Sequence, residues 1–428
     1  MSQTNAFKRI LLLAYNERRV LAGATVALLC TASLNLAYPQ LIRMIIDRVK
    51  PGGDPEVVTH YVLGLFVIFL AVAVITALRM YLFEIAGERI VVRLRKRLFE
   101  ALIHQDIAFF DERHSGALIN RLSADTTVVQ NAATVNLSMA LRFSLAAIGS
   151  LIILSFTSLE LTLVMLAIVP PAVIGTRIYG RWIKRLSTTV QDQLADTTSI
   201  AEESLAGIRT IRAFDAHNHI LNRYSNGIDK AFNTAKERAY RIATFGGIAG
   251  LVGYGAVCGV LWYGGQLYVS KQLSLGELTS FMLYTFTIAF SISALGTVWQ
   301  SFMKAAGASK RVFDVIDQEV NLLSGPQQPP EPFDQLVFEK VCFNYPARAD
   351  MSVLNDISFK LEHGSKLAIV GPSGAGKSTI AALIARLYDP SEGRIRVNGI
   401  PVNDLDIHWW RSQFGVVFQA SSLFAYSI

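Results

Sequence analysis

Nine consecutive residues have the types and spacing of a loop that holds the phosphates of a nucleotide. They are Gly371, Pro372, Ser373, Gly374, Ala375, Gly376, Lys377, Ser378 and Thr379. Glycines let backbone N–H groups turn inward around an anion, and the start of a following helix adds partial positive charge. Lys377 can reach the terminal phosphates, and the Ser378 hydroxyl can bind Mg²⁺. The loop therefore predicts a site for ATP or a similar triphosphate together with Mg²⁺.

The residues on either side supply the elements that must position this loop. Leu367–Val370 is a short, continuously apolar run, which is typical of a buried parallel strand. Residues 380–387 are good helix formers. Strand, loop and helix is the order that the motif requires. Upstream, residues 336–343 and 357–361 alternate in polarity as strands do.

The composition places most of the chain in a membrane. Of 428 residues, 52% are hydrophobic and only 17% are charged. A spanning helix needs about 20 apolar residues, and six runs qualify: 20–46, 58–84, 135–156, 160–182, 243–269 and 277–303. A soluble protein with six such runs would have too little polar surface to cover them. We therefore predict six transmembrane helices.

Positive charge gives the orientation of these helices. The net charge is +7, and Lys and Arg gather in the two long segments that follow the second and fourth runs. This asymmetry predicts that both segments and both termini are cytoplasmic. Aromatic and basic residues are not interleaved, so we expect no nucleic-acid partner. The three cysteines form no metal or disulfide pattern.

Both long segments repeat apolar residues at helical spacing, over residues 78–108 and 186–240. We expect the transmembrane helices to continue through them as amphipathic extensions. Each segment also holds a turn rich in aromatic and charged residues, at 109–113 and 212–216, that suits docking onto a partner domain. A Pro- and Gln-rich linker follows at 321–333.

These features together resemble a half-size ABC exporter, a fused permease and ATP-binding subunit. Segments 109–126, 202–218 and 304–316 are similar to that family's docking turns and to the end of its last membrane helix. The resemblance implies an all-α polytopic membrane domain with six transmembrane helices and long cytoplasmic extensions over residues 1–320. After the linker, residues 334–428 would be the N-terminal part of an α/β P-loop ATPase domain, ending after the Gln-loop.

The resemblance also implies roles for two further residues. Tyr345 matches the aromatic residue that stacks on adenine, and Gln419 matches the glutamine that approaches Mg²⁺ and the attacking water. It implies a second half-transporter as partner, in a homodimer or heterodimer, surrounding membrane lipid, and a small-molecule or lipid substrate. Because importers usually separate permease from ATPase, the fusion favours export.

The family's signature loop, catalytic glutamate and switch histidine follow the Gln-loop, and no segment of this chain matches them. We therefore expect a C-terminally truncated fragment that contains no catalytic residues and does not hydrolyse ATP by the family mechanism. Two alternatives remain: a membrane nucleotide-binding or regulatory protein without ATPase activity, and a membrane-anchored kinase or GTPase, which the docking turns disfavour. No cleaved signal or transit peptide is evident, which predicts a bacterial inner membrane.

Charged residues also occur in or near the apolar runs. Arg43, Asp47, Arg79 and Glu84 lie near the predicted ends of their runs, where we expect the side chains to reach toward the membrane surface. Arg142 lies deeper in the third run and is the best candidate for a charge that faces an internal cavity.

Overall fold

The computed structural model describes residue 9 and residues 12–48, 55–113, 115–320, 322–328 and 334–417. Its contacts divide the chain into two compact units. We call Glu17–Ala86 with Thr134–Phe302 the helical unit. We call Met1–Asn16, Gly87–Ala133 and Met303–Ile428 the P-loop unit. Two long helices, α3 (Pro55–Ile103) and α11 (Leu275–Ile316), contribute residues to both units.

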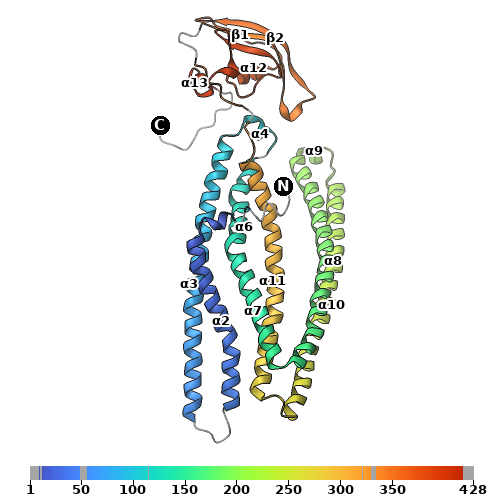
Figure 1. Ribbon diagram of the computed structural model, residues 1–428. Coiled ribbons are helices and arrows are strands. Elements are labelled where there is room, and N and C mark those ends of the chain that lie inside the picture. Colours follow the sequence, from blue (N-terminus) through green and yellow to red (C-terminus); the bar gives the residue numbers. More distant parts are fainter. Residues whose placement is uncertain are drawn as a thin grey trace. The chain divides into compact units, whose positions relative to one another are not determined.

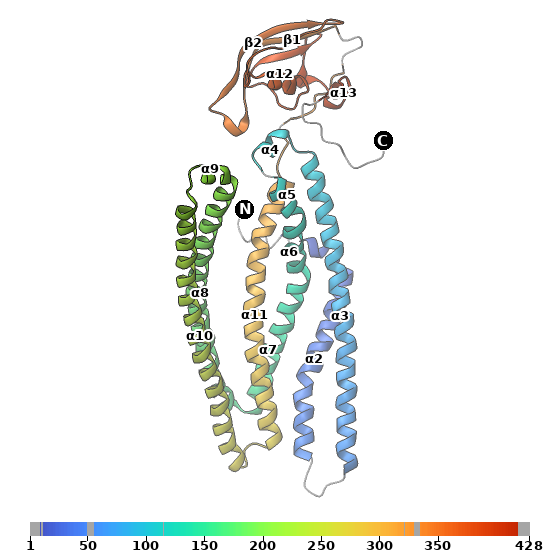
Figure 2. The ribbon, with the colours of Figure 1, turned by 180° about the vertical axis from the view of Figure 1, so that it is seen from behind.

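Long helices make up the helical unit. Besides parts of α3 and α11, they are α2 (Arg18–Arg48), α7 (Leu137–Thr157), α8 (Leu159–Ala206), α10 (His217–Val269) and the short α9 (Ile208–Ala213). Helices α8 and α10 lie side by side and are joined through α9 (Figures 1 and 2). Tyr179 of α8 stacks on Phe245 of α10 with ring centroids 4.4 Å apart. The predicted helical extensions are confirmed, because α3, α8 and α10 continue well beyond their apolar runs.

Among the described residues, five helical segments are long and apolar enough to cross a membrane. They are Arg18–Arg48, Val58–Ile103, Ser115–Thr157, His217–Val269 and Leu275–Ile316. The predicted fourth run, 160–182, lies within α8, where several side chains are outside the described part of the structure. The predicted class of a helical membrane domain followed by a smaller sheet-containing part is confirmed.

The core of the helical unit joins four helices. Leu154 of α7, Met165 of α8, Val260 of α10 and Phe281 of α11 belong to one buried apolar cluster. Tyr284 of α11 is almost fully buried in the same cluster, and its hydroxyl donates to the backbone carbonyl of Leu36 in α2. A buried phenol needs such a partner, so this bond fixes the rotation of α11 against α2.

The C-terminal part of the P-loop unit contains a four-stranded sheet in the order β2-β1-β3-β4. Its strands are β1 (Gln335–Asn344), β2 (Ser352–Glu362), β3 (Glu392–Val397) and β4 (Ile400–Pro401), paired antiparallel. The two strands predicted upstream of the loop are confirmed as β1 and β2. Helix α12 (Lys377–Ile384) lies against one face of this sheet (Figure 1), and α13 (Ile407–Ser412) is the last described helix.

A small apolar core binds these elements together. Phe338 and Phe343 of β1, Leu383 of α12 and Trp410 of α13 are each at most 2% exposed. The Trp410 indole N–H donates to the carbonyl of Ile384 at 2.8 Å, which satisfies its only polar atom at the end of α12. The core therefore fixes the helix that carries the loop.

The prediction of a buried strand at Leu367–Val370 is not met among the described residues. These four residues form no strand, and Val370 is 86% exposed. A parallel strand is stable only between neighbours that satisfy its backbone groups and cover its side chains. The described strands pair with one another in an antiparallel sheet, and none of them pairs with this run.

Candidate nucleotide site and its helical contact

The loop at 371–379 leads directly into α12 as the motif requires. Gly376 caps the helix with φ of +78°, in the left-handed region that favours glycine. A Cβ at this position would meet Leu354 Cδ2 at 2.6 Å. Glycine is therefore needed both for the turn and for the close approach of the loop to β2. The first N–H groups of a helix have no acceptor within it, so those of α12 can donate to an anion bound at the loop.

Lys377 is the cation of this site. Its ammonium donates to the carbonyl oxygens of Gly371 at 2.9 Å and Pro372 at 2.6 Å. Both acceptors are neutral, so a triphosphate would compete for the ammonium with a stronger, charge-assisted bond. The structure thus places Lys377 where it can transfer from the loop's carbonyls to a phosphate.

The chemistry of the loop also fits Mg²⁺. Ser378 is the first residue after Lys377 and is exposed at the start of α12. The described residues contain no group of three His, Cys, Asp or Glu side chains able to hold a metal ion by themselves. Mg²⁺ usually takes one or two protein oxygens and completes its shell with phosphate and water. Ser378 with a bound triphosphate suits that mode of binding.

Tyr345 lies at the loop helix. Its hydroxyl is 3.0 Å from the Thr379 hydroxyl, and Thr379 is 4% exposed. Its ring meets Phe343 and Tyr388 edge-on, with centroids 5.0 and 5.3 Å away. The structure therefore brings together Tyr345 and the loop, while its role in stacking on adenine stays a prediction. Gln419, the other residue expected at the nucleotide, lies outside the described residues.

The first docking turn, 109–113, overlaps α4 (Ile107–Asp111), and it contacts the nucleotide-binding part within the P-loop unit. The Tyr388 hydroxyl donates to Asp111 Oδ2 at 2.5 Å. Phe109 is 4% exposed, and the Arg113 guanidinium lies 3.9 Å from its ring centroid. The turn at 109–113 thus serves as a docking element for its own chain's nucleotide-binding part.

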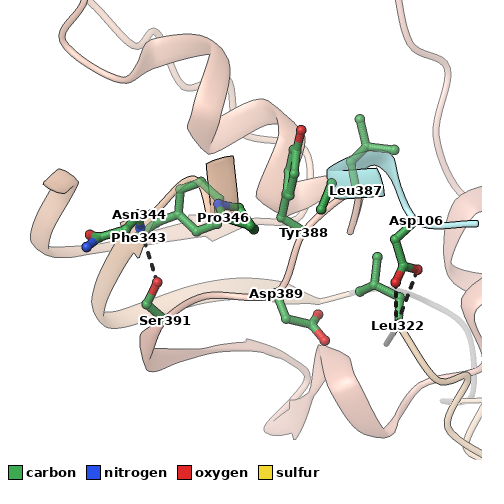
Figure 3. Close-up of a pocket in the computed structure, with 10 residues that line it drawn as sticks. Asp106, Leu322, Phe343, Asn344, Pro346, Leu387, Tyr388, Asp389 and Ser391 are labelled. Atoms are coloured by element: carbon green, nitrogen blue, oxygen red, sulfur yellow. Dashed lines mark hydrogen bonds between the residues drawn. The ribbon is translucent and has the colours of Figure 1, made fainter. Parts of the chain in front are cut away.

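A cleft of about 330 Å³ lies beside this contact (Figure 3). Ala108 of α4 and Asp106, the residue before α4, line it on one side, and Phe343, Tyr388 and Asp389 line it from the nucleotide-binding part. The Asp106 carboxylate accepts a hydrogen bond from the backbone N–H of Leu322 (Figure 3). This bond connects the start of the linker to the residue that precedes α4.

The Tyr388–Asp111 bond is stable over the physiological pH range. Burial and the adjacent Asp111 carboxylate raise the pKa of Tyr388 above its usual range, because both disfavour the phenolate. Stabilisation by the phenol is therefore fully present below about pH 10, the ordinary pKa of tyrosine. It is lost only as the pH rises through the higher pKa of the folded state.

Sequence reasoning missed Tyr388. It lies beyond the loop helix, and nothing in the spacing of its neighbours distinguishes it from an ordinary surface tyrosine. Its partner Asp111 was inside the predicted docking turn, but the sequence could not show which residue the turn would contact.

Comparison with known families identifies the chain. Residues 21–292 match the family described as ABC transporter transmembrane region, and residues 354–427 match the family described as ABC transporter. The chain belongs to the ABC transporter family. The predicted family is confirmed, because the permease and ATP-binding parts of an ABC transporter lie on one chain.

Several curated ABC transporters are similar to it over nearly its whole length. ABC transporter B family member 1 of Dictyostelium discoideum is 38% identical over 98% of this chain and 46% of its own length. Mouse ATP-binding cassette sub-family B member 10, mitochondrial, is 36% identical over 98% of this chain and 60% of its own. The mitochondrial ATP-dependent permease MDL1 of Schizosaccharomyces pombe is 35% identical, over 94% and 56%. The chain thus spans about half the length of these relatives.

The prediction of a bacterial inner membrane is wrong. The mouse and fission-yeast relatives of this ABC transporter are named as mitochondrial proteins of eukaryotes. The prediction rested on the N-terminal residues, where a short apolar piece and a few charges do not distinguish one membrane from another. The chain is an integral membrane protein.

Proposed function

We propose that this chain is a subunit of an ATP-driven exporter that moves an amphipathic or other small substrate across the membrane. ATP with Mg²⁺ would bind at the loop that ends in Lys377, Ser378 and Thr379. Closure of two nucleotide-binding parts around ATP would then switch a membrane cavity outward. The observation that carries the proposal is that one compact unit contains both this loop and the docking helix α4.

A short path of contacts supports coupling between the two. Thr379 of the loop contacts the Tyr345 hydroxyl, and the Tyr345 ring contacts the Tyr388 ring. Tyr388 then donates to Asp111 of α4. A nucleotide that moves the loop or Tyr345 would therefore move a residue in direct contact with α4. Such a chain of packed side chains is a physical route for coupling binding to movement.

The second docking turn supports a partner subunit. In the helical unit, α9 has no buried residue, and Phe214 at its C-terminal end is 80% exposed. A large aromatic side chain at the tip of a helical hairpin is typical of a contact surface. In the proposed dimer, this turn would dock on the nucleotide-binding part of a second half-transporter, identical or different.

The proposal is tested with the purified protein in neutral detergent and in proteoliposomes. We expect saturable binding of MgATP by this chain, and ATP-dependent movement of at least one compound from a panel of amphipathic substrates by the full-length dimer. MgATP binding with neither transport nor ATPase activity would favour a regulatory nucleotide-binding protein. Absence of ATP binding would refute the site itself.

Tyr388→Phe tests the proposed coupling path. The ring keeps its packing on Tyr345 and Phe343, while the bond to Asp111 is lost. We expect ATP affinity to change by less than about twofold, since no group that contacts the loop is removed. We expect the response of α4 to ATP, measured as hydrogen exchange of residues 107–111 with and without MgATP, to fall by more than half.

Tyr240→Phe is the matched control, because Tyr240 is 72% exposed on α10 and its hydroxyl forms no hydrogen bond among the described contacts. It should leave the exchange response of α4 unchanged. An α4 response in Tyr388→Phe equal to that of the unaltered protein would show that coupling does not pass through this bond.

A further inference from the structure

Arg79 of α3 is a buried cation in the helical unit. It is 7% exposed, although its place near the end of an apolar run predicted a side chain reaching toward the membrane surface. That prediction is wrong for Arg79, because the side chain turns toward α7 and its Nη1 donates to Ser138 Oγ at 2.7 Å. Its Nε is buried without a hydrogen-bond partner.

Among the described residues, no carboxylate forms an ion pair with Arg79. Arg43, another arginine of the same unit, shows the usual arrangement: its guanidinium is 2.6 Å from Glu277 and 3.8 Å from Asp47. A buried charge without a partner is costly, and five N–H donors on one guanidinium cannot be satisfied by a single serine hydroxyl. Among the described side chains, none supplies the negative charge that would offset the burial of this guanidinium.

A second cation lies beside it. Ser138 and Arg142 are four residues apart in α7, so they share the helix face that meets Arg79. The positive charge of Arg142 acts on the Arg79 guanidinium. Arg142 is exposed and forms no ion pair in the described part of the chain. Two arginines that repel one another, one buried and one open to the surroundings, make a site of concentrated positive potential.

The surroundings of this pair are apolar. Leu82 and Phe83 lie one turn along α3 from Arg79, and Leu145 lies one turn along α7 from Arg142. All three belong to one apolar cluster together with Leu28. A ligand at the two arginines would therefore meet cations at one end and hydrocarbon at the other.

We propose that Arg79, Arg142 and Ser138 bind the acidic group, carboxylate or phosphate, of an amphipathic ligand in the membrane domain. Arg142 receives the anion, Arg79 supplies a second guanidinium behind it, and the neighbouring leucines contact the apolar part. The planar fork of a guanidinium matches both carboxylate and phosphate oxygens. This inference rests on the proposed function and specifies its substrate class as an acidic amphiphile, either a free molecule or a lipid.

The test is calorimetric titration of the purified protein in dodecyl maltoside, without nucleotide. The probes are dodecyl phosphate and dodecanoate, with dodecanol and dodecyltrimethylammonium as neutral and cationic analogues. We expect the two acidic probes to bind at least about tenfold more tightly than the neutral and cationic analogues, because one charge-assisted contact changes affinity by about this factor. Equal binding of dodecanol and dodecyl phosphate would overturn the proposal.

Two variants locate the site. Arg142→Gln changes an exposed residue and keeps the fold, and Arg79→Met replaces the buried cation by a hydrocarbon of similar length. Each should weaken binding of dodecyl phosphate about tenfold or more. If Arg79 is retained for a ligand and not for packing, Arg79→Met should not lower the melting temperature of the ligand-free protein. Arg185→Gln, an exposed arginine of α8, is the matched control and should bind the probe normally.

Acidic-probe binding that is unchanged in both Arg79→Met and Arg142→Gln would overturn the proposal. Repeating the titration in nanodiscs of phosphatidylcholine alone, or with phosphatidylglycerol added, separates the two sources of the acidic group. If phosphatidylglycerol competes with the probe, the natural ligand is a lipid. If it does not compete, the natural ligand is a free amphiphile. Failure of MgATP binding in a parallel experiment would refute the nucleotide site alone, because the titrations contain no nucleotide.

Discussion

Lys377→Ala should weaken binding of MgATP by about 10- to 100-fold. The lost contact is a charge-assisted bond to phosphate, worth about 1.5–3 kcal/mol. Lys377 also donates to the carbonyls of Gly371 and Pro372. Loss of these two hydrogen bonds should affect the order of the loop. The loss of the positive charge at the phosphates should remain the larger part of the effect on ATP binding. Equilibrium titration with a fluorescent ATP analogue measures the change.

Lys366→Ala is the matched control for this measurement. Lys366 is exposed, precedes the loop by a few residues and lies outside the motif. It should bind the analogue within about twofold of the unaltered protein, since a surface charge contributes little at this distance. If Lys377→Ala bound ATP as tightly as Lys366→Ala, the assignment of the nucleotide site would be refuted.

Trp410→Ala should destabilise the nucleotide-binding part by about 3–5 kcal/mol, the usual cost of removing a large aromatic side chain from a core. Trp410 is fully buried, and its ring meets Phe414 edge-on at 4.5 Å. Its loss also leaves the Ile384 carbonyl without the indole donor. The free energy of unfolding of this part is measured on the whole chain, by following protease cleavage within residues 334–417 as a function of urea concentration.

Trp409→Ala provides the comparison. The side chain has the same size and lies next to Trp410, but it is only half-buried and packs at the edge of the core. We expect its substitution to cost less than half as much. Equal destabilisation by the two variants would show that the effect comes from α13 as a whole and not from the buried indole.

The long helices and the loop helix could be predicted because their information is local. Apolar runs and helical spacing predicted that α3, α8 and α10 continue beyond their apolar segments. The glycine pattern predicted the turn into α12. Alternating polarity gave β1 and β2 for the same reason. In each case the residues that determine the element lie within the element.

The contacts could not be predicted, because they join residues far apart in the chain. Tyr388 and Asp111 are 277 positions apart, and neither shows from sequence which partner it will meet. Arg79 was misplaced because its position along the run indicates depth in a membrane, but not which helix it faces. The run at Leu367–Val370 has the local pattern of a strand but forms none among the described residues, because a strand also needs a neighbouring strand to pair with.

The exposed run at Leu367–Val370 has a consequence for handling the protein. Val370 is 86% exposed and Leu367 48%, and Val416 and Val417 are also exposed. Short apolar segments with free backbone groups and β-branched residues are templates for pairing between molecules. We expect the purified chain to self-associate through this run as its concentration rises. A single charge there, as in Val370→Lys, should delay precipitation without touching the membrane helices.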